Sequence, residues 1–182
     1  MRAVPPGWLA QTRPGGLILA PWGTRYSDQD ALVGLRVGRD GQAHGRFLRM
    51  AEFMKLREPT ARLAAVRRVR PGVSRGRQVR FVPGLCVPGC AHVVNRLGDG
   101  SAKAWFFDLG SRSWAVAEFP DGESGGTVRQ SGPRTLWDEA ERALEWWVRR
   151  GRPALGRFGV TVGSDGSARP WLDDPAKVLP TG

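Results

Sequence analysis

Apolar runs separated by Asp-Gly pairs indicate that most of the chain forms antiparallel β-hairpins. An Asp-Gly pair between two apolar runs favours a tight turn, because both residue types tolerate positive φ. The flanked pairs are Asp40-Gly41 (31–37 and 44–50), Asp99-Gly100 (92–97 and 102–108) and Asp165-Gly166 (158–162 and 168–172), and a fourth is Asp121-Gly122. The middle and the end of the chain are therefore expected to be mostly antiparallel β-structure.

One segment, from Leu136 to Arg150, has the periodicity of an amphipathic helix. Thr135 stands at the position of a cap, acidic residues follow in the first turn, and Gly151 stands where helices commonly end. The apolar face expected from the spacing consists of Leu136, Ala140, Leu144, Trp147 and Val148. Two i,i+4 ion pairs are expected, Asp138–Arg142 and Glu145–Arg149.

The segment from Val4 to Gly23 combines a proline-led turn with a short apolar run. Pro5-Pro6 predicts the start of a helical turn that ends at a Pro-Gly-Gly sequence. The run Leu17–Ala20 then has four consecutive apolar residues, which is typical of a strand buried on both faces. Such a strand needs a neighbour on each side, and only three residues precede the segment.

Composition places the chain in the ordinary globular class. It has 182 residues, of which 41% are hydrophobic and 25% charged, enough for one domain or for a small domain with a fragment of another. No apolar run approaches the roughly 20 residues that cross a bilayer, so no membrane partner is expected. Two cysteines do not make a disulfide framework, and no secretory signal opens the chain; we therefore expect a cytoplasmic protein.

A net charge of +11 raises the question of nucleic-acid binding. Nearly all the excess is arginine, which a GC-biased coding sequence produces without selection for binding. The arginines between 62 and 80 are the best candidates for phosphate contacts, but no aromatic residues are interleaved among them. Nucleic-acid binding is therefore kept only as the third alternative, behind an enzyme fragment and a binding module.

The segment Val4–Gly23 resembles the late motif of protein-L-isoaspartate O-methyltransferases. That motif is a proline-led helix, a Gln, a Lys/Arg-Pro-Gly-Gly turn, an apolar strand and Pro-x-Gly. The corresponding residues here are Val4-Pro5-Pro6, Gln11, Arg13-Pro14-Gly15-Gly16, Leu17–Ala20 and Pro21-Trp22-Gly23. In that family the motif follows everything that binds S-adenosylmethionine. The resemblance implies that residues 1–57 are an α/β fragment, the end of a Rossmann-like methyltransferase sheet.

The same resemblance implies a substrate site. In the family, a glycine-rich loop holding a Gln follows the strand, and an aromatic-Val-Pro-Leu segment lines the substrate pocket. On the matching positions the resemblance implies substrate contacts from Thr24, Gln29, Phe53 and Leu56. Met54-Lys55 replaces Val-Pro, a departure that weakens the case for an isoaspartyl substrate. Core packing is the alternative role for Phe53 and Leu56.

The rest of the chain reads as a basic linker at 58–78 followed by an α+β, mostly antiparallel domain at 79–182. Stretches at 84–90, 129–139 and 157–162 resemble the C-terminal extension of bacterial methyltransferases of this group, some of which are associated with ribosomally made peptides. The eight tryptophans of the chain, six of them in this domain, are expected to serve as core residues rather than as a stacking platform.

A Rossmann-like methyltransferase binds S-adenosylmethionine with a glycine-rich turn after its first strand. The sequence has no glycine-rich strand-to-helix turn, so we expect no catalytic and no cofactor-binding residues here. The expected function is the C-terminal part of a protein carboxyl O-methyltransferase with a protein or peptide substrate. It would be inactive alone and complemented by a separate cofactor-binding chain. A non-catalytic protein- or peptide-binding module is the alternative.

Cys86, Cys90 and His92 form the spacing C-x3-C-x-H, which is reminiscent of a zinc site. A structural zinc site needs four ligands, and no second pair of Cys or His follows. The expected reading is two buried thiols beside a Pro-Gly bend, without a metal.

Overall fold

The computed structural model describes residues 4–27, 29–51, 78–121 and 125–181. Its elements are α1 (Pro6–Gln11), β1 (Leu17–Gly23), β2 (Asp30–Val37), β3 (Ala43–Ala51), α2 (Gln78–Cys86), β4 (Ala91–Arg96), β5 (Ala102–Asp108), β6 (Ser113–Phe119), β7 (Thr127–Ser131), α3 (Leu136–Arg149), the short 3-10 helix η1 (Leu155–Arg157), β8 (Phe158–Val162) and β9 (Ala168–Leu172).

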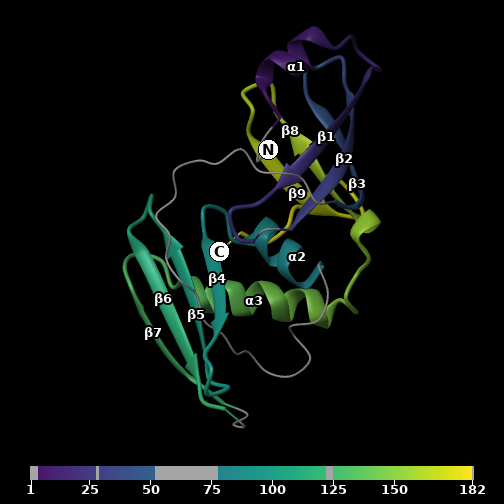
Figure 1. Cartoon of the computed structure of the whole chain (residues 1–182). Coiled ribbons are helices and arrows are strands. Elements are labelled where there is room, and N and C mark those ends of the chain that lie inside the picture. Colours follow the sequence, from purple (N-terminus) through teal and green to yellow (C-terminus); the bar gives the residue numbers. More distant parts are fainter. Residues whose placement is uncertain (1–3, 28, 52–77, 122–124, 182) are drawn as a thin grey trace.

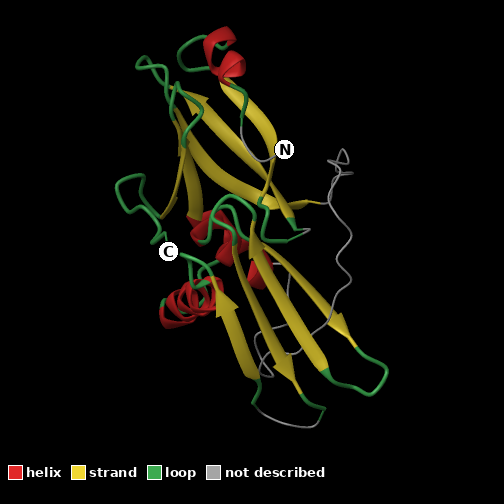
Figure 2. Ribbon diagram, turned by 90° about the vertical axis from the view of Figure 1, so that its left-hand side faces the viewer, coloured by secondary structure: helices red, strands yellow, loops and turns green. Residues whose placement is uncertain are grey.

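Two antiparallel sheets make up most of the described structure. The five-stranded sheet has the order β1-β2-β3-β8-β9, and the four-stranded sheet has the order β4-β5-β6-β7. Figures 1 and 2 show α2 and α3 between the two sheets. The expectation of mostly antiparallel β-structure is confirmed, and the Rossmann-like character expected of residues 1–57 is not.

The three hairpins flanking Asp-Gly pairs are confirmed, and their turns share one construction. The glycine takes a left-handed φ of 76°, 79° and 82° at Gly41, Gly100 and Gly166. The aspartate before it accepts a hydrogen bond from the backbone N–H two residues further on, at 2.9–3.1 Å. Glycine adopts this φ without a steric penalty, and the carboxylate replaces a missing backbone acceptor. Local sequence therefore fixes these turns.

The strand expected to be buried on both faces is an edge strand instead. Its burial alternates, with Ile18 and Ala20 buried and with Leu17 66% and Leu19 56% exposed. Only its pairing with β2 is seen in the described part of the chain. Four apolar residues in a row did not distinguish a strand enclosed by neighbours from a strand with one apolar face and one exposed face.

The five-stranded sheet takes strands from both sides of the expected linker. Residues 43–46 of β3 pair antiparallel with residues 159–162 of β8. β8 and β9 thus continue a sheet that begins with β1, β2 and β3. Residues 52–77, most of the expected linker, lie outside the described residues, and α2 begins at Gln78.

The predicted helix is confirmed as α3, which ends one residue earlier than expected. Its apolar face is rotated from the expected one, because Ala143 is buried and Val148 is exposed. Asp138 accepts a hydrogen bond from the Gln130 side chain at 2.8 Å, and Glu145 pairs with Arg149 as expected. With 14 residues, α3 is the longest helix in the described part of the chain, and none there could cross a bilayer.

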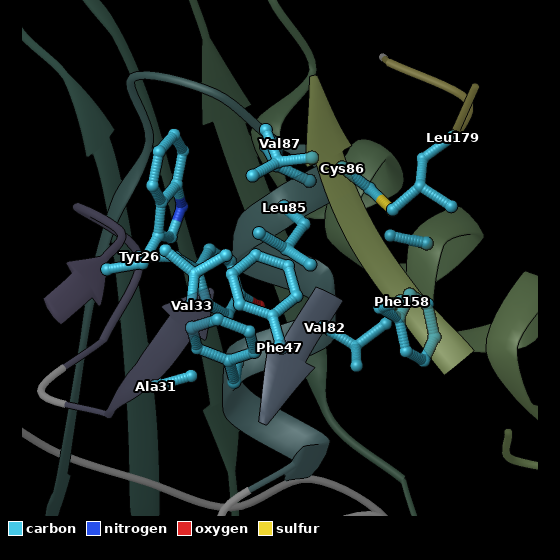
Figure 3. Packing of buried hydrophobic residues seen from close by; sticks show 14 of the residues in the cluster. Tyr26, Ala31, Val33, Phe47, Val82, Leu85, Cys86, Val87, Phe158 and Leu179 are labelled. Carbon is cyan, nitrogen blue, oxygen red and sulfur yellow. The ribbon is translucent and has the colours of Figure 1, made fainter. Parts of the chain in front are cut away.

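Helix α2 supplies the centre of the core and has no counterpart among the elements expected from the sequence. Pro83 and Gly84 lie inside it, and both residue types normally argue against a helix. Figure 3 shows Val82 and Leu85 of α2 close to Phe47 of β3. Phe47 also meets Phe81 edge-to-face with ring centroids 5.2 Å apart. Buried residues from both sheets and from α1, α2 and α3 form one hydrophobic cluster.

Candidate functional site

The loop after β1 carries two of the four substrate residues implied by the family resemblance. Thr24 and Gln29 lie at its two ends, and both side chains are buried. The backbone N–H of Gln29 donates to Ser27 Oγ at 3.2 Å, which closes the end of the loop. Phe53 and Leu56 lie outside the described residues. The structure therefore places Thr24 and Gln29 on one loop, with their side chains turned away from solvent.

Helix α2 packs directly against this loop at Gly84. A Cβ atom at Gly84 would collide with the Thr24 side chain and with Cβ of Tyr26. The helix can approach the loop this closely only because Gly84 has no side chain. Thr24 Oγ1 is buried at the contact and has no hydrogen-bond partner among the described residues. The loop and α2 are thus a tightly fitted unit.

Strand β4 holds the loop from the other side through His92. The rings of Tyr26 and His92 stack with centroids 4.6 Å apart, and Phe106 stacks on His92 at 5.1 Å. His92 Nδ1 lies 2.9 Å from the backbone oxygen of Tyr26; a carbonyl only accepts, so this nitrogen carries the proton and donates. Burial raises the pKa of the Tyr26 hydroxyl. His92 is therefore engaged in packing the two sheets together.

The thiols expected beside the Pro-Gly bend are both free and buried. Burial raises the pKa of Cys86 and of Cys90 to about 12. Since the thiolate is the reactive form of cysteine, neither is prepared to act as a nucleophile near neutral pH. No group of three or more potential metal-ligating side chains lies together in the described part of the chain.

Arg134 is the centre of a polar cluster that the sequence analysis missed. Its guanidinium donates to Asp108 at 3.0 Å, to the Pro88 carbonyl at 2.8 Å and to Glu139. Glu139 first, and then Asp108, raises the pKa of Arg134. Hydrogen bonding from Ser111 chiefly lowers the pKa of Asp108. An arginine just before a helix with Glu139 in the first turn was the available signal. The cluster fastens α3 to β5 and to the turn before β4.

Among the described residues, no strand pairs with the outer edge of β1. Val37 N–H donates to the Gly16 carbonyl at 3.0 Å, so every second residue from Gly16 turns its backbone groups toward β2. Leu17, Leu19 and Pro21 consequently turn theirs outward. A proline without an N–H is tolerated there because no neighbouring strand needs its hydrogen bond.

The other edge of the five-stranded sheet is covered. The chain after β9 folds back on it, and Leu179 N–H donates to the Pro170 carbonyl at 2.8 Å. Leu172 N–H likewise donates to the carbonyl of Lys177 at 3.1 Å. An open strand edge is a template for pairing with another chain. Of the two edges of this sheet, β1 is therefore the one that no described segment covers.

A groove of about 600 Å³ lies at one end of the four-stranded sheet. Lys103, Glu118, Phe119 and Thr127 are among its lining residues. Lys103 and Glu118 form an ion pair of 2.8 Å, and the hydrogen bond from Lys103 is the main cause of the lowered pKa of Glu118. The pair neutralises charge in the lining, and the lowered pKa keeps Glu118 a carboxylate near neutral pH, where it cannot act as a general acid.

Comparisons of the chain with protein-family models, with curated proteins and with solved structures found no significant match. Function is therefore inferred from the residues and their geometry. The histidine, the tyrosine and the thiols around the loop are engaged in packing, whereas no described strand covers the β1 edge and Trp105 and Trp114 of the four-stranded sheet are partly exposed.

Proposed function

We propose that this chain is the C-terminal part of an S-adenosylmethionine-dependent protein carboxyl O-methyltransferase of the isoaspartyl type, inactive without a cofactor-binding unit. The supporting observation is the open edge of β1. The strand that carries the family-like motif ends a sheet and exposes Leu17 and Leu19. In the proposal, β1, β2 and β3 form the end of a larger, Rossmann-like sheet that a separate cofactor-binding chain completes.

Pairing at β1 would be favourable for two reasons. A partner strand would form hydrogen bonds with the outward backbone groups of Leu17 and Leu19. A covering element would also bury their side chains, each contributing about 1.5–3 kcal/mol if burial were complete. Leu48 of β3 is exposed on the same face, since it packs beside Gly34, and would extend that contact.

The proposed role of the chain is to position a protein or peptide substrate. Ligands of open α/β sheets bind beyond the carboxyl ends of the strands, and the loop Thr24–Gln29 leaves the carboxyl end of β1. Among the described residues of this loop, Arg25 is the exposed one, and in the proposal it meets the substrate first. Contacts by Thr24 and Gln29 would require the loop to open. The proposed location is the cytoplasm, where free thiols persist.

Reconstitution tests the proposal. The chain is mixed with the cofactor-binding portion of an isoaspartyl methyltransferase, and transfer of tritiated methyl from S-adenosylmethionine to an isoaspartyl peptide is counted. We expect no transfer by the chain alone and transfer by the mixture. Leu19→Lys should lower the transfer at least tenfold by placing a charge against the partner. Val148→Lys is the matched control, because Val148 is an exposed apolar residue on α3.

Three results would contradict the proposal. Micromolar binding of S-adenosylmethionine by the chain alone, measured by calorimetry, would show that a cofactor site exists within it. Absence of transfer in the mixture would count against the methyltransferase assignment. Equal transfer by the Leu19→Lys and Val148→Lys variants would show that the β1 edge is not where the partner docks.

A further inference from the structure

The outer face of the four-stranded sheet carries an apolar patch, which we call the aromatic face. Phe106 and Ala104 of β5 point into the core, so the alternate residues of this strand point outward. The strand register then assembles the patch from Val93, Trp105, Phe107, Trp114 and Val116. Figure 1 shows α3 on the opposite side of this sheet, so the aromatic face is turned away from the rest of the fold.

Exposure distinguishes this patch from the core. Trp105 is 37% and Trp114 43% exposed, contrary to the expectation that the tryptophans are core residues. Val116 lies between them in the register, is only 4% exposed and yet is not part of the main hydrophobic cluster. In the strand register its neighbours on this face are Trp105 and Arg129, and Trp114 lies two residues before it on the same strand. The patch thus has two half-exposed tryptophans beside one buried valine.

The rim of the patch is polar and charged. Trp105 and Val116 share a row with Arg129, and the next row contains Lys103 and Glu118. Glu118 pairs with Lys103 at 2.8 Å and with Arg129 at 3.5 Å. An apolar centre with tryptophans and a polar rim is the anatomy of a protein–protein interface.

We propose that the aromatic face binds an extended acidic peptide segment whose aromatic or leucine side chains pack against Trp105 and Trp114. The inference deepens and rests on the proposed function, because the segment would belong to the protein or peptide substrate. The charge of +11 on the chain attracts an acidic segment. Arg129 and Lys103 lie beside the apolar centre, where a bound carboxylate could replace part of their interaction with Glu118.

Charge also argues against two other occupants. A second copy of the chain would bring another +11 to the same surface and be repelled. Single-stranded nucleic acid is held by a row of phosphate contacts beside its stacked bases. On the described part of this face, Lys103 and Arg129 both pair with the Glu118 carboxylate, which leaves a net charge of about +1. This charge is too small for a row of phosphate contacts. An acidic peptide with apolar anchors fits this balance better.

Fluorescence anisotropy with labelled dodecamers tests the inference. The probes are a Glu-rich peptide with two spaced phenylalanines, the same peptide with both changed to alanine, a Lys-rich counterpart and oligothymidine. We expect the Glu-rich phenylalanine peptide to bind and the other three to bind at least tenfold more weakly. Trp105→Ala and Trp114→Ala should each weaken that binding about tenfold, as residues at an interface centre do. Arg129→Glu should weaken it as well.

Trp8→Ala is the matched control, because Trp8 is 39% exposed but lies on α1 in the other half of the fold. Circular dichroism melts establish that each variant is folded. Equal affinity of the Trp8, Trp105 and Trp114 variants, or equal binding of the alanine peptide, would overturn the inference. So would tryptophan-dependent binding of oligothymidine in place of the acidic peptide, or a dimer that Trp105→Ala dissociates.

The two proposals fail separately. The anisotropy measurement uses no cofactor-binding unit. Peptide binding without methyl transfer in the reconstituted mixture would therefore contradict the methyltransferase proposal and support the peptide-binding role of the aromatic face. In the opposite case, methyl transfer to a version of the Glu-rich phenylalanine peptide that carries one isoaspartyl residue would occur with the same KM in the wild-type chain and in the Trp105→Ala variant. That result would keep the methyltransferase and overturn the aromatic face.

Discussion

At the scale of single residues, Gly84 sets how closely α2 approaches the β1–β2 loop. Gly84→Ala places a methyl group against the Thr24 side chain and Cβ of Tyr26. Despite the gain in helix propensity, we expect a loss of about 1–3 kcal/mol in the free energy of unfolding, measured by urea titration. Gly98→Ala is the control, since nothing lies within 4 Å of its added Cβ. A loss no larger than that of the control would mean that the loop yields easily.

The two buried thiols predict a decline of stability in alkaline solution. The pKa of each is raised from 9.0 to about 12 in the folded chain, so the unfolded chain loses these protons first as pH rises. The contribution of the two protonated thiols to the free energy of unfolding is complete below pH 9 and is lost between pH 9 and about 12. Cys86→Ala and Cys90→Ala should each flatten the slope of unfolding free energy against pH above pH 9.

Tyr26 contributes a slope of the same sign, because its pKa is also raised by burial. The Cys86→Ala/Cys90→Ala double variant should therefore retain part of the alkaline decline, and adding Tyr26→Phe should remove more of it. A parallel measurement is alkylation by iodoacetamide, which should be slow at pH 8 in the native chain and fast in urea. Rapid native alkylation would contradict the burial of the thiols.

At the scale of elements, the sequence predicts what neighbouring residues decide. The hairpins follow from turns such as Asp40-Gly41, whose geometry needs only local hydrogen bonds. Helix α3 follows from spacing alone. Helix α2 escaped prediction because its stability comes from burying Phe81 and Leu85 between the sheets, which outweighs the low helix propensity of Pro83 and Gly84.

In the candidate sites, too, the sequence predicts the element to which a residue belongs but not the side on which its side chain lies. Membership of Trp105 and Trp114 in strands could be predicted, but not the face they occupy. The inward positions of β5 are held by Ala102 and Ala104, which let α3 approach the sheet, and this choice depends on a partner distant in sequence. The position of Thr24 in the loop could likewise be predicted, whereas its burial under α2 could not.

The Arg134 cluster should dominate the attachment of α3. Arg134→Met leaves the buried Glu139 carboxylate without its cation, and we expect a loss of about 2–4 kcal/mol in unfolding free energy. We expect a loss near the lower end of this range because the Arg134 side chain is still 21% exposed to solvent. Adding Glu139→Gln should recover part of the loss, since no unpaired charge then remains buried. Denaturant melts of both variants measure this.

The exposed pair Glu145–Arg149 on the same helix is the matched control. Arg149→Met should change the unfolding free energy by less than about 0.5 kcal/mol, because surface i,i+4 pairs contribute little. Similar losses from Arg134→Met and Arg149→Met would show that the cluster does not hold the helix to the sheet.

At the scale of the whole molecule, the five-stranded sheet ties the two ends of the chain together. A fragment of residues 79–182 keeps β8 and β9 but loses β3, against which β8 pairs. We expect such a fragment to lack a single cooperative unfolding transition and to be cleaved by trypsin near Arg157, while the full chain resists. A fragment that melts cooperatively with protected Arg157 would show that the C-terminal part folds independently.

The same topology imposes a delay during synthesis on the ribosome. Arg46 donates to the Gly156 carbonyl at 3.2 Å across 110 positions of sequence. At a translation rate of roughly 5–20 residues per second, β3 emerges about 5–20 s before its partner strand exists. Throughout that interval Phe47 and its neighbours have no β8 to cover them. The nascent chain should therefore depend on chaperones during this interval, and its five-stranded sheet should close only after β8 has emerged.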